Sequence, residues 1–287
     1  MSSRWAGWRR IAGGFVALAA VFVTRPVQAG DWPTYRHDSA RTGWTADPLR
    51  LPFAERWVYT APARPRMAWA GDEGVRREGL VMVQRVKFDD AFHAAVAGGR
   101  LYFGSSVDHR LHCLRVADGT EEWSYCTGGP IRLAPTVAED RVWFGSDDGY
   151  AYCLEARTGR LVWKVRAAPA EDWLLARGEM ISRWPVRTGV LVDRGVAYFG
   201  AGIFPHENVY LGAVDCRDGK LLWKQDAVSE SNFHRNDLSP QGHLLLQGDI
   251  LYVPSGRTLP AYVDRRDGRV LQKPSQTWRF AKPGGGD

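Results

Sequence analysis

Residues 141–165 read RVWFGSDDGYAYCLEARTGRLVWKV, and this stretch decides the fold. Short runs of β-branched and aromatic residues alternate in it with turns that contain glycine. The Asp148-Gly149 pair is typical of a tight hairpin, because glycine accepts a positive φ without steric cost. Residues 141–165 therefore predict three strands, and residues 132–137 before them supply a fourth, inner strand. Four antiparallel strands in about 40 residues have the size of one blade of a β-propeller.

The same pattern returns along the chain. The aromatic strand has matching positions at Phe103, Phe144, Phe199 and, more loosely, Val253. Each copy leads to a turn glycine, and the residues four positions after that glycine are Trp123, Trp163, Trp223 and, in the last copy, Gln272. A lone four-stranded sheet can bury neither of its faces, so such copies must stack side by side. We predict an all-β fold, a β-propeller with about four blades, each of four antiparallel strands.

Residues 1–29 have the features of a secretory signal peptide. A basic start precedes the apolar run Ile11–Val23, and Val27-Gln28-Ala29 fits a small-x-small cleavage site. The apolar run would span about 20 Å as a helix, which is shorter than a hydrocarbon core of about 30 Å. We expect cleavage after Ala29 and export to the periplasm or the extracellular space, with an uncleaved anchor helix as the alternative. No membrane span is expected after residue 30.

Most of the net positive charge of the chain comes from this first segment. The formal net charge is +6, and the first 29 residues hold four arginines and no acid. The remainder is nearly balanced. It gives no reason to expect nucleic acid or an anionic membrane surface as a partner.

Beyond the signal peptide we expect three regions. Residues 30–60 form a lead-in that ends in an outer-strand pattern around Trp57, residues 61–87 form an irregular linker, and residues 88–287 form the blades. The lead-in strand has no inner strands before it, and the fourth copy already owns an outer strand. We infer an incomplete ring, either truncated or in need of a protein partner or the remaining half of the propeller. A compact closure of four or five blades is the alternative.

The run Gly145–Trp163 closely resembles the PQQ-like propeller repeat of quinoprotein alcohol dehydrogenases and BamB-type outer-membrane assembly proteins. Residues 32–43, WPTYRHDSARTG, resemble the lead-in of such proteins. The resemblance covers Asp31 to about Gln272 and implies a propeller. PQQ and calcium are cofactors by this resemblance alone. Quinone enzymes of this family bind calcium with carboxylates and amides, and many place a vicinal cysteine pair against the quinone.

This chain has no vicinal cysteines, and we assign the Asp147-Asp148 pair to a hairpin turn rather than to a metal. We therefore expect a non-catalytic binding or scaffold module for a protein or a small ligand. The alternative is a fragment or subunit of a PQQ-dependent dehydrogenase. No catalytic residue and no metal ligand is predicted.

Two sets of repeated residues are expected to serve packing. The tryptophans predicted to cover the seams between blades are Trp57, Trp123, Trp163 and Trp223. Cys113 and Cys153 hold equivalent positions in neighbouring copies. Equivalent positions lie about one blade apart, beyond the ~7 Å limit for a disulfide, so we expect buried, free thiols.

The inner strands supply the candidate ligand site. Counting back from the aromatic marker, His93, Ala134, Gly189 and His243 share one position, and Arg132, Arg187 and Gln241 share another. Inner-strand ends line the central channel of a propeller. The residues predicted to form a basic, aromatic channel mouth are His93, Arg132, Arg183, Trp184, Arg187, Gln241 and His243. Such a mouth suits an anionic ligand or a peptide carboxylate. In the alternative, the arginines bond carbonyls or acids of adjacent blades.

Overall fold

The computed structural model describes residues 30–48, 51–68, 76–77, 80–81, 89–176, 178–204, 207–226, 228, 237–256 and 259–273. The predicted signal peptide and part of the predicted linker lie outside these residues. Within the linker, residues 61–68 have no regular structure, and a short pair follows: β1 (Arg76–Arg77) and β2 (Leu80–Val81).

Four antiparallel sheets of four strands form the body of the described chain, and in each sheet neighbouring strands follow one another in the sequence. Blade 1 comprises β3 (Ala94–Ala97), β4 (Arg100–Gly104), β5 (Arg110–Arg115) and β6 (Glu121–Cys126). Blade 2 comprises β7 (Thr136–Ala138), β8 (Arg141–Gly145), β9 (Ala151–Glu155) and β10 (Leu161–Val165). Blade 3 comprises β13 (Leu191–Asp193), β14 (Val196–Ala201), β15 (Tyr210–Asp215) and β16 (Leu221–Gln225). Blade 4 comprises β17 (Leu245–Gln247), β18 (Ile250–Val253), β19 (Ala261–Asp264) and β20 (Val270–Gln272). These sheets confirm the predicted all-β propeller architecture.

The strand pairing confirms the alignment of the four copies. The outer strand pairs with the third strand in the same register in all four blades, and each pairing contains a bulge at the same place. The equivalent residue pairs are Cys113–Trp123, Cys153–Trp163, Ala213–Trp223 and Tyr262–Gln272. Gln272 therefore stands where the other blades carry tryptophan. One predicted boundary was wrong: the inner strand of blade 2 begins at Thr136 rather than Arg132. Pro135, which has no N–H to donate to a ladder, precedes that start.

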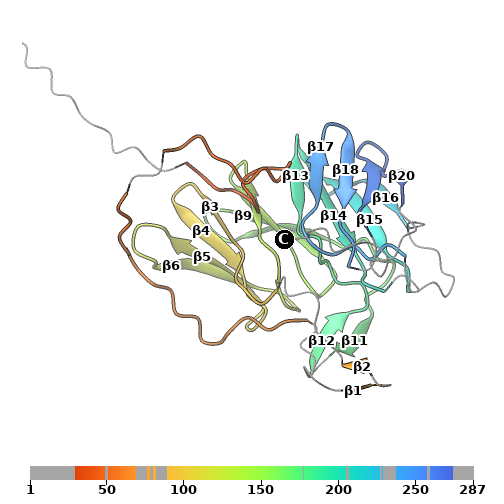
Figure 1. Ribbon diagram of the computed structural model, residues 1–287, viewed down its shortest axis with the longest axis horizontal. Coiled ribbons are helices and arrows are strands. Elements are labelled where there is room, and N and C mark those ends of the chain that lie inside the picture. The colour runs from red at the N-terminus through yellow and green to blue at the C-terminus, as the bar shows by residue number, and fades with distance from the viewer. Residues whose placement is uncertain are drawn as a thin grey trace, which may run out of the picture.

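The four blades meet in three apolar seams. One buried cluster joins blade 1 to blade 2, a second joins blade 2 to blade 3, and a third joins blade 3 to blade 4. No such cluster of the described residues joins blade 4 to blade 1, and Figure 1 shows these two blades on opposite sides of the molecule. The blades therefore form an open arc, as the sequence predicted, and not a compact closure.

Each repeated tryptophan packs on the turn glycine of the next blade. The glycine–tryptophan pairs are Gly119–Trp57, Gly159–Trp123, Gly219–Trp163 and Gly268–Trp223, and a Cβ on any of these glycines would lie between 2.5 and 2.9 Å from the indole. Each indole Nε1 also donates to the carbonyl oxygen three residues before its glycine, and these acceptors are Val116, Ala156, Cys216 and Arg265. The repeated tryptophans thus serve blade packing.

The lead-in behaves differently from the prediction. Residues 54–59 form no strand, although Trp57 keeps the position of an outer-strand tryptophan. The earlier part of the lead-in crosses the innermost strand of every blade. Trp32 pairs with Val96 of β3, and the other hydrogen bonds are Val137 N to Pro33 O at 2.7 Å, Ser39 Oγ to Val192 O at 3.3 Å, and Leu246 N to Ser39 O at 2.8 Å. We call residues 32–39 the strap.

The extra length between blades 2 and 3 forms a hairpin. Its strands are β11 (Trp173–Ala176) and β12 (Glu179–Ser182), paired in regular antiparallel register. Figure 1 shows this hairpin projecting away from the blades. The polar stretch Ser231–Asn236, which lies between the third and fourth copies of the repeat, is outside the described residues.

Candidate functional site at the hub and along the first seam

The first set of equivalent inner-strand residues converges at the hub. His243 Nε2 accepts a hydrogen bond of 3.3 Å from the amide of Ala134. The His243 ring lies 5.7 Å from the ring of His93, and a Cβ on Gly189 would lie 3.8 Å from His243 Cδ2. All four blades therefore contribute to one cluster around His243.

The lead-in covers this cluster. Tyr35 stacks on His243 with ring centroids 3.8 Å apart, and Arg41 Nε donates to the carbonyl of Leu244 at 2.8 Å. Burial, the nearby Arg41 charge and His93 lower the pKa of His243 well below its ordinary value of 6.5. His243 is therefore neutral at pH 7, which fits its role as the acceptor of the Ala134 amide.

The second set of inner-strand residues forms a buried ionic cluster. Arg187 donates to both oxygens of Asp147 at 2.8 and 2.7 Å, and Arg132 Nε donates to Asp147 Oδ2 at 2.6 Å. Arg132 Nη1 also reaches Asp89 Oδ2 at 3.0 Å. The four side chains are 4% exposed or less. Burial opposes ionisation of Asp147, but the two guanidinium groups outweigh it and lower its pKa.

Asp147 lies in the predicted turn, and this cluster gives it a second role that the sequence did not show. Asp147 is the shared acceptor of two arginines, Arg132, which precedes blade 2, and Arg187, which precedes blade 3. Its neighbour Asp148 does keep a turn role, because it accepts from the amides of Gly128 and Tyr150. Two buried cations face two buried anions, so the basic character predicted for this part of the hub is neutralised within the protein.

The remaining residues of the predicted mouth lie around this cluster. Arg183 is 39% exposed, pairs with Asp172 and Glu207 at 3.0 Å each, and lies over the ring of Trp184. The Trp184 indole is buried and donates to the carbonyl of Glu207. Gln241 Nε2 donates to Ser239 Oγ at 2.8 Å. Every predicted mouth residue therefore has a protein neighbour, and a ligand-binding role for them stays a prediction.

The hub does not fit PQQ with calcium. Calcium needs six to eight oxygen ligands, whereas both hub carboxylates, Asp89 and Asp147, are already bonded to guanidinium groups. Across the described residues, no three or more histidine, cysteine or acidic side chains gather as a metal site. Cys113 and Cys153 are buried free thiols in separate blades, as the repeat predicted, and Cys126 is exposed.

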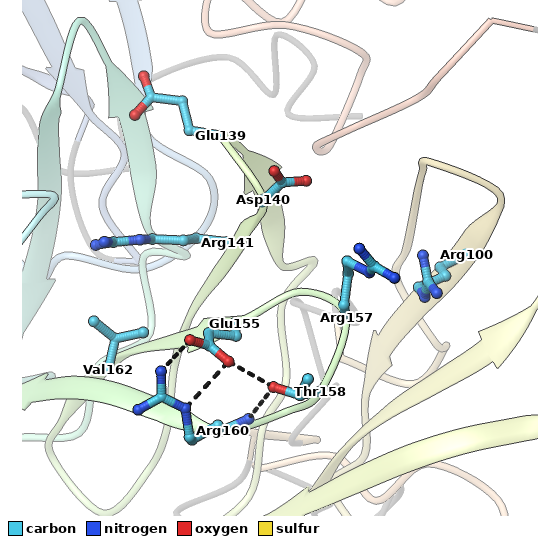
Figure 2. A pocket seen from close by; sticks show the side chains of 9 residues that line it. All are labelled: Arg100, Glu139, Asp140, Arg141, Glu155, Arg157, Thr158, Arg160 and Val162. Carbon is cyan, nitrogen blue, oxygen red and sulfur yellow. Dashed lines mark hydrogen bonds and ion pairs between the residues drawn. The ribbon is translucent and has the colours of Figure 1, made fainter.

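A groove along the seam of blades 1 and 2 is lined by charged side chains. It has a volume of about 520 Å³ and is shown in Figure 2. Its lining residues are Arg100, Glu139, Asp140, Arg141, Glu155, Arg157, Thr158, Arg160 and Val162. A second hollow of about 630 Å³ shares four of these residues and continues to Asp31 and Pro33 of the lead-in.

Some charged side chains of this groove are bonded within the described part of the protein and others are not. Arg160 and Thr158 bond Glu155, and Arg141 Nη1 donates to the carbonyls of Cys216 and Arg217. In contrast, no hydrogen bond or ion pair among the described residues uses the side chains of the exposed residues Glu139, Asp140 and Arg157. Figure 2 shows Arg157 and Arg100 pointing toward one another from neighbouring blades. The groove thus presents both signs of charge to solvent.

The sequence did not identify this groove, although it contained one signal. The turn between the first two strands of blade 2 is Glu139-Asp140, and both residues take positive φ, 46° and 57°. The same turn in blade 1 uses Gly98 and Gly99. Positive φ is strained for residues with a Cβ, and it places two carboxylates side by side at the groove. Only the comparison between repeats could have shown that glycine is replaced there.

Comparison with known proteins agrees with this architecture. The family model described as outer membrane protein assembly factor BamB matches residues 38–183 and 146–279, and its repeats are PQQ-like. The chain belongs to this PQQ-like repeat family. One curated relative of this chain is the dehydrogenase subunit of a quinone-dependent alcohol dehydrogenase from Gluconobacter oxydans, which is 33% identical over 129 residues. That match covers 40% of this chain and 16% of the relative.

A second curated relative has a different name. The outer membrane protein assembly factor BamB of Yersinia pestis is 26% identical over 161 residues, covering 54% of this chain and 39% of BamB. The matched part of this chain therefore spans well under half of the length of these two curated relatives.

Solved structures agree at the level of the fold. A quinohemoprotein alcohol dehydrogenase from Pseudomonas putida HK5 superposes with a TM-score of 0.52 at 15% identity, over 67% of this chain and 35% of that one. Among the described residues, no helix has the length and apolar character needed to span a membrane.

Proposed function

We propose that this chain is an exported, non-catalytic PQQ-like propeller module that binds a protein partner along the groove of Figure 2. The observation that carries the proposal is a contrast between two sets of charges. At the hub, Arg132, Arg187 and Asp147 neutralise one another in a buried cluster, whereas Glu139 and Arg157 of the groove are exposed and unbonded within the described chain. Binding energy is available from charges that have no internal partner.

The groove favours a partner segment that carries both signs of charge. Glu139 and Asp140 suit a lysine or arginine of the partner, and Arg157 beside Arg100 suits a carboxylate. The segment is a polar peptide rather than a free anion, since the nine lining residues include three acids as well as four arginines. Export is supported by the composition of residues 1–29.

Site-specific photo-crosslinking in the native cell tests the groove. A photo-reactive residue at position 157 should give a defined covalent adduct with one protein, identified by mass spectrometry. The double variant Glu139→Lys/Asp140→Lys should lose the adduct by charge repulsion of the partner's cation. The matched control is the same photo-reactive residue at Arg194, an 82% exposed arginine of blade 3. Identical adducts from positions 157 and 194 would contradict the groove.

A second candidate function rests on the similarity to quinone-dependent dehydrogenase subunits. In that case the chain is a fragment or subunit of a PQQ-dependent dehydrogenase, and purified protein mixed with PQQ and calcium should hold one quinone per chain and reduce an artificial dye with alcohols or sugars. We expect neither, because the hub carboxylates are bonded to arginine. A stoichiometric quinone spectrum after gel filtration would favour the dehydrogenase.

A further inference from the structure

Residues 54–59 sit where the outer strand of a missing blade belongs. In the three seams, an outer-strand tryptophan packs on the turn glycine of the next blade and donates to a carbonyl three residues earlier. Trp57 makes the same two contacts with blade 1. Its Nε1 donates to the carbonyl of Val116 at 2.8 Å, and a Cβ placed on Gly119 would lie 2.8 Å from its ring. No described strand pairs with residues 54–59. A blade placed before blade 1 must therefore accept them as its outer strand.

Blade 4 shows the complementary deficit. Its outer strand β20 has three residues, against five or six in the other blades, and Gln272 replaces the seam tryptophan. Its outward face is also uncovered. Tyr252 is only half-buried, whereas the equivalent residues of the three preceding blades are 2% exposed or less, and these are Tyr102, Trp143 and Tyr198. Among the described residues, no blade packs on the outward face of blade 4, and its outer strand is short.

We propose that two copies of this chain close a ring, with blade 4 of each copy packed on blade 1 of the other. Residues 54–59 of one copy then pair with β19 of the second copy in place of β20. By the register of the other blades, Trp57 stands opposite Tyr262, as Trp123 stands opposite Cys113.

A second copy fits because each chain carries both residues 54–59, which have no strand partner among the described residues, and blade 4, whose outer strand is short. In the described part of the chain they lie at opposite ends of the open arc in Figure 1 and do not meet. Two copies related by a twofold axis satisfy both ends at once, through a head-to-tail contact that closes after two steps. The exposed apolar side chains Leu51 (77%) and Phe53 (69%) precede the segment that would be exchanged, and Val58 (67%) lies within it. An unpaired apolar edge of this kind favours strand addition. This assembly does not depend on the function proposed for the groove.

Light scattering on the purified full chain, run with reductant because Cys126 is exposed, tests the ring. The wild type should be a dimer. Val58→Pro should be a monomer, because proline has no N–H to donate to the strand pairing between copies. The substitution should leave the single chain folded, because no described hydrogen bond uses the Val58 amide. Val58→Thr, which keeps a β-branched side chain, is the matched control and should remain a dimer. All three proteins should share one far-UV circular dichroism spectrum.

Hydrogen exchange identifies the strand that moves. The amides of residues 55–59 should exchange slowly in the wild-type dimer and rapidly in Val58→Pro. A second variant, Gln272→Trp, strengthens β20 and should shift the equilibrium toward monomer by about tenfold or more. A wild type that is monomeric at every concentration overturns the proposal. So does a dimer whose residues 55–59 exchange freely, or one that survives Val58→Pro.

Discussion

Arg187 donates hydrogen bonds to both carboxylate oxygens of Asp147, at 2.8 and 2.7 Å. Because the pair is buried and Asp147 also accepts from Arg132, removing the carboxylate charge leaves two buried cations with reduced compensation. We expect Asp147→Asn to lower the free energy of unfolding by about 3–5 kcal/mol, measured by urea denaturation. Asp118→Asn is the control, since this half-exposed turn residue pairs with Arg115 on the surface, and it should cost much less than Asp147→Asn. Equal losses for both variants would argue against a structural role of the hub cluster.

The contact between Gly159 and Trp123 separates steric from conformational effects. A Cβ at Gly159 would lie 2.6 Å from the indole, and φ there is +69°. Gly195 has a similar φ of +75° and no atom within 4 Å of its Cβ position. Both substitutions to alanine should therefore carry the same backbone strain, of about 1 kcal/mol. Gly159→Ala should cost about 1–3 kcal/mol more than Gly195→Ala in thermal or urea unfolding, because the seam must open.

Trp163 should contribute to stability through both its ring and its N–H. The indole is 7% exposed and donates to the carbonyl of Cys216 at 3.0 Å. We expect Trp163→Ala to cost about 3–5 kcal/mol and Trp163→Phe about 1–3 kcal/mol, since phenylalanine fills much of the space but leaves the carbonyl without its donor. Trp44→Ala, at a tryptophan that is 68% exposed, should change the unfolding free energy by about 0.5 kcal/mol or less. Similar losses at Trp44 and Trp163 would contradict seam packing.

His243 should make the stability of the protein depend on mild acid. Its pKa is lowered in the folded state, so below pH 6.5 the unfolded chain binds a proton that the folded chain does not. The contribution of neutral His243 is therefore present above that pH and is lost as the pH falls. The slope approaches about 1.4 kcal/mol per pH unit. Urea unfolding between about pH 5 and pH 8 should show this slope in the wild type and not in His243→Asn. An unchanged slope in His243→Asn would place the titration elsewhere.

The blades could be predicted from sequence because their signals are local and repeated. The Asp148-Gly149 turn, the aromatic strand and the tryptophan four residues after the glycine fix strand number, order and register within about 40 residues. The seam could be predicted for the same reason, since Trp57 and Trp163 occur at one position of the repeat. Even the missing tryptophan at Gln272 was visible, and the strand pairing with Tyr262 confirms its place.

The site was harder to predict because its contacts are distant in sequence. Arg187 reaches Asp147 across 40 residues, and Arg132 reaches Asp89 across 43. A single repeat shows which arginines face the hub, but it cannot show that acids from neighbouring loops meet them there. The outer strand predicted at residues 54–59 was wrong for a related reason. A sequence with a strand pattern forms a strand only beside a partner strand, and no described strand pairs with these residues.

The strap and the residues that follow it couple the lead-in to blade 4. Ser39 bonds β13 and β17, and Arg41 bonds the carbonyl of Leu244, which is 203 residues further along. During synthesis the strap emerges first, yet its final partner emerges last. Contacts of such long sequence separation slow the search for the native state. Blades 1 to 3 should therefore form before the hub is complete, and the slow step should be the packing of Tyr35 on His243 once blade 4 has been made.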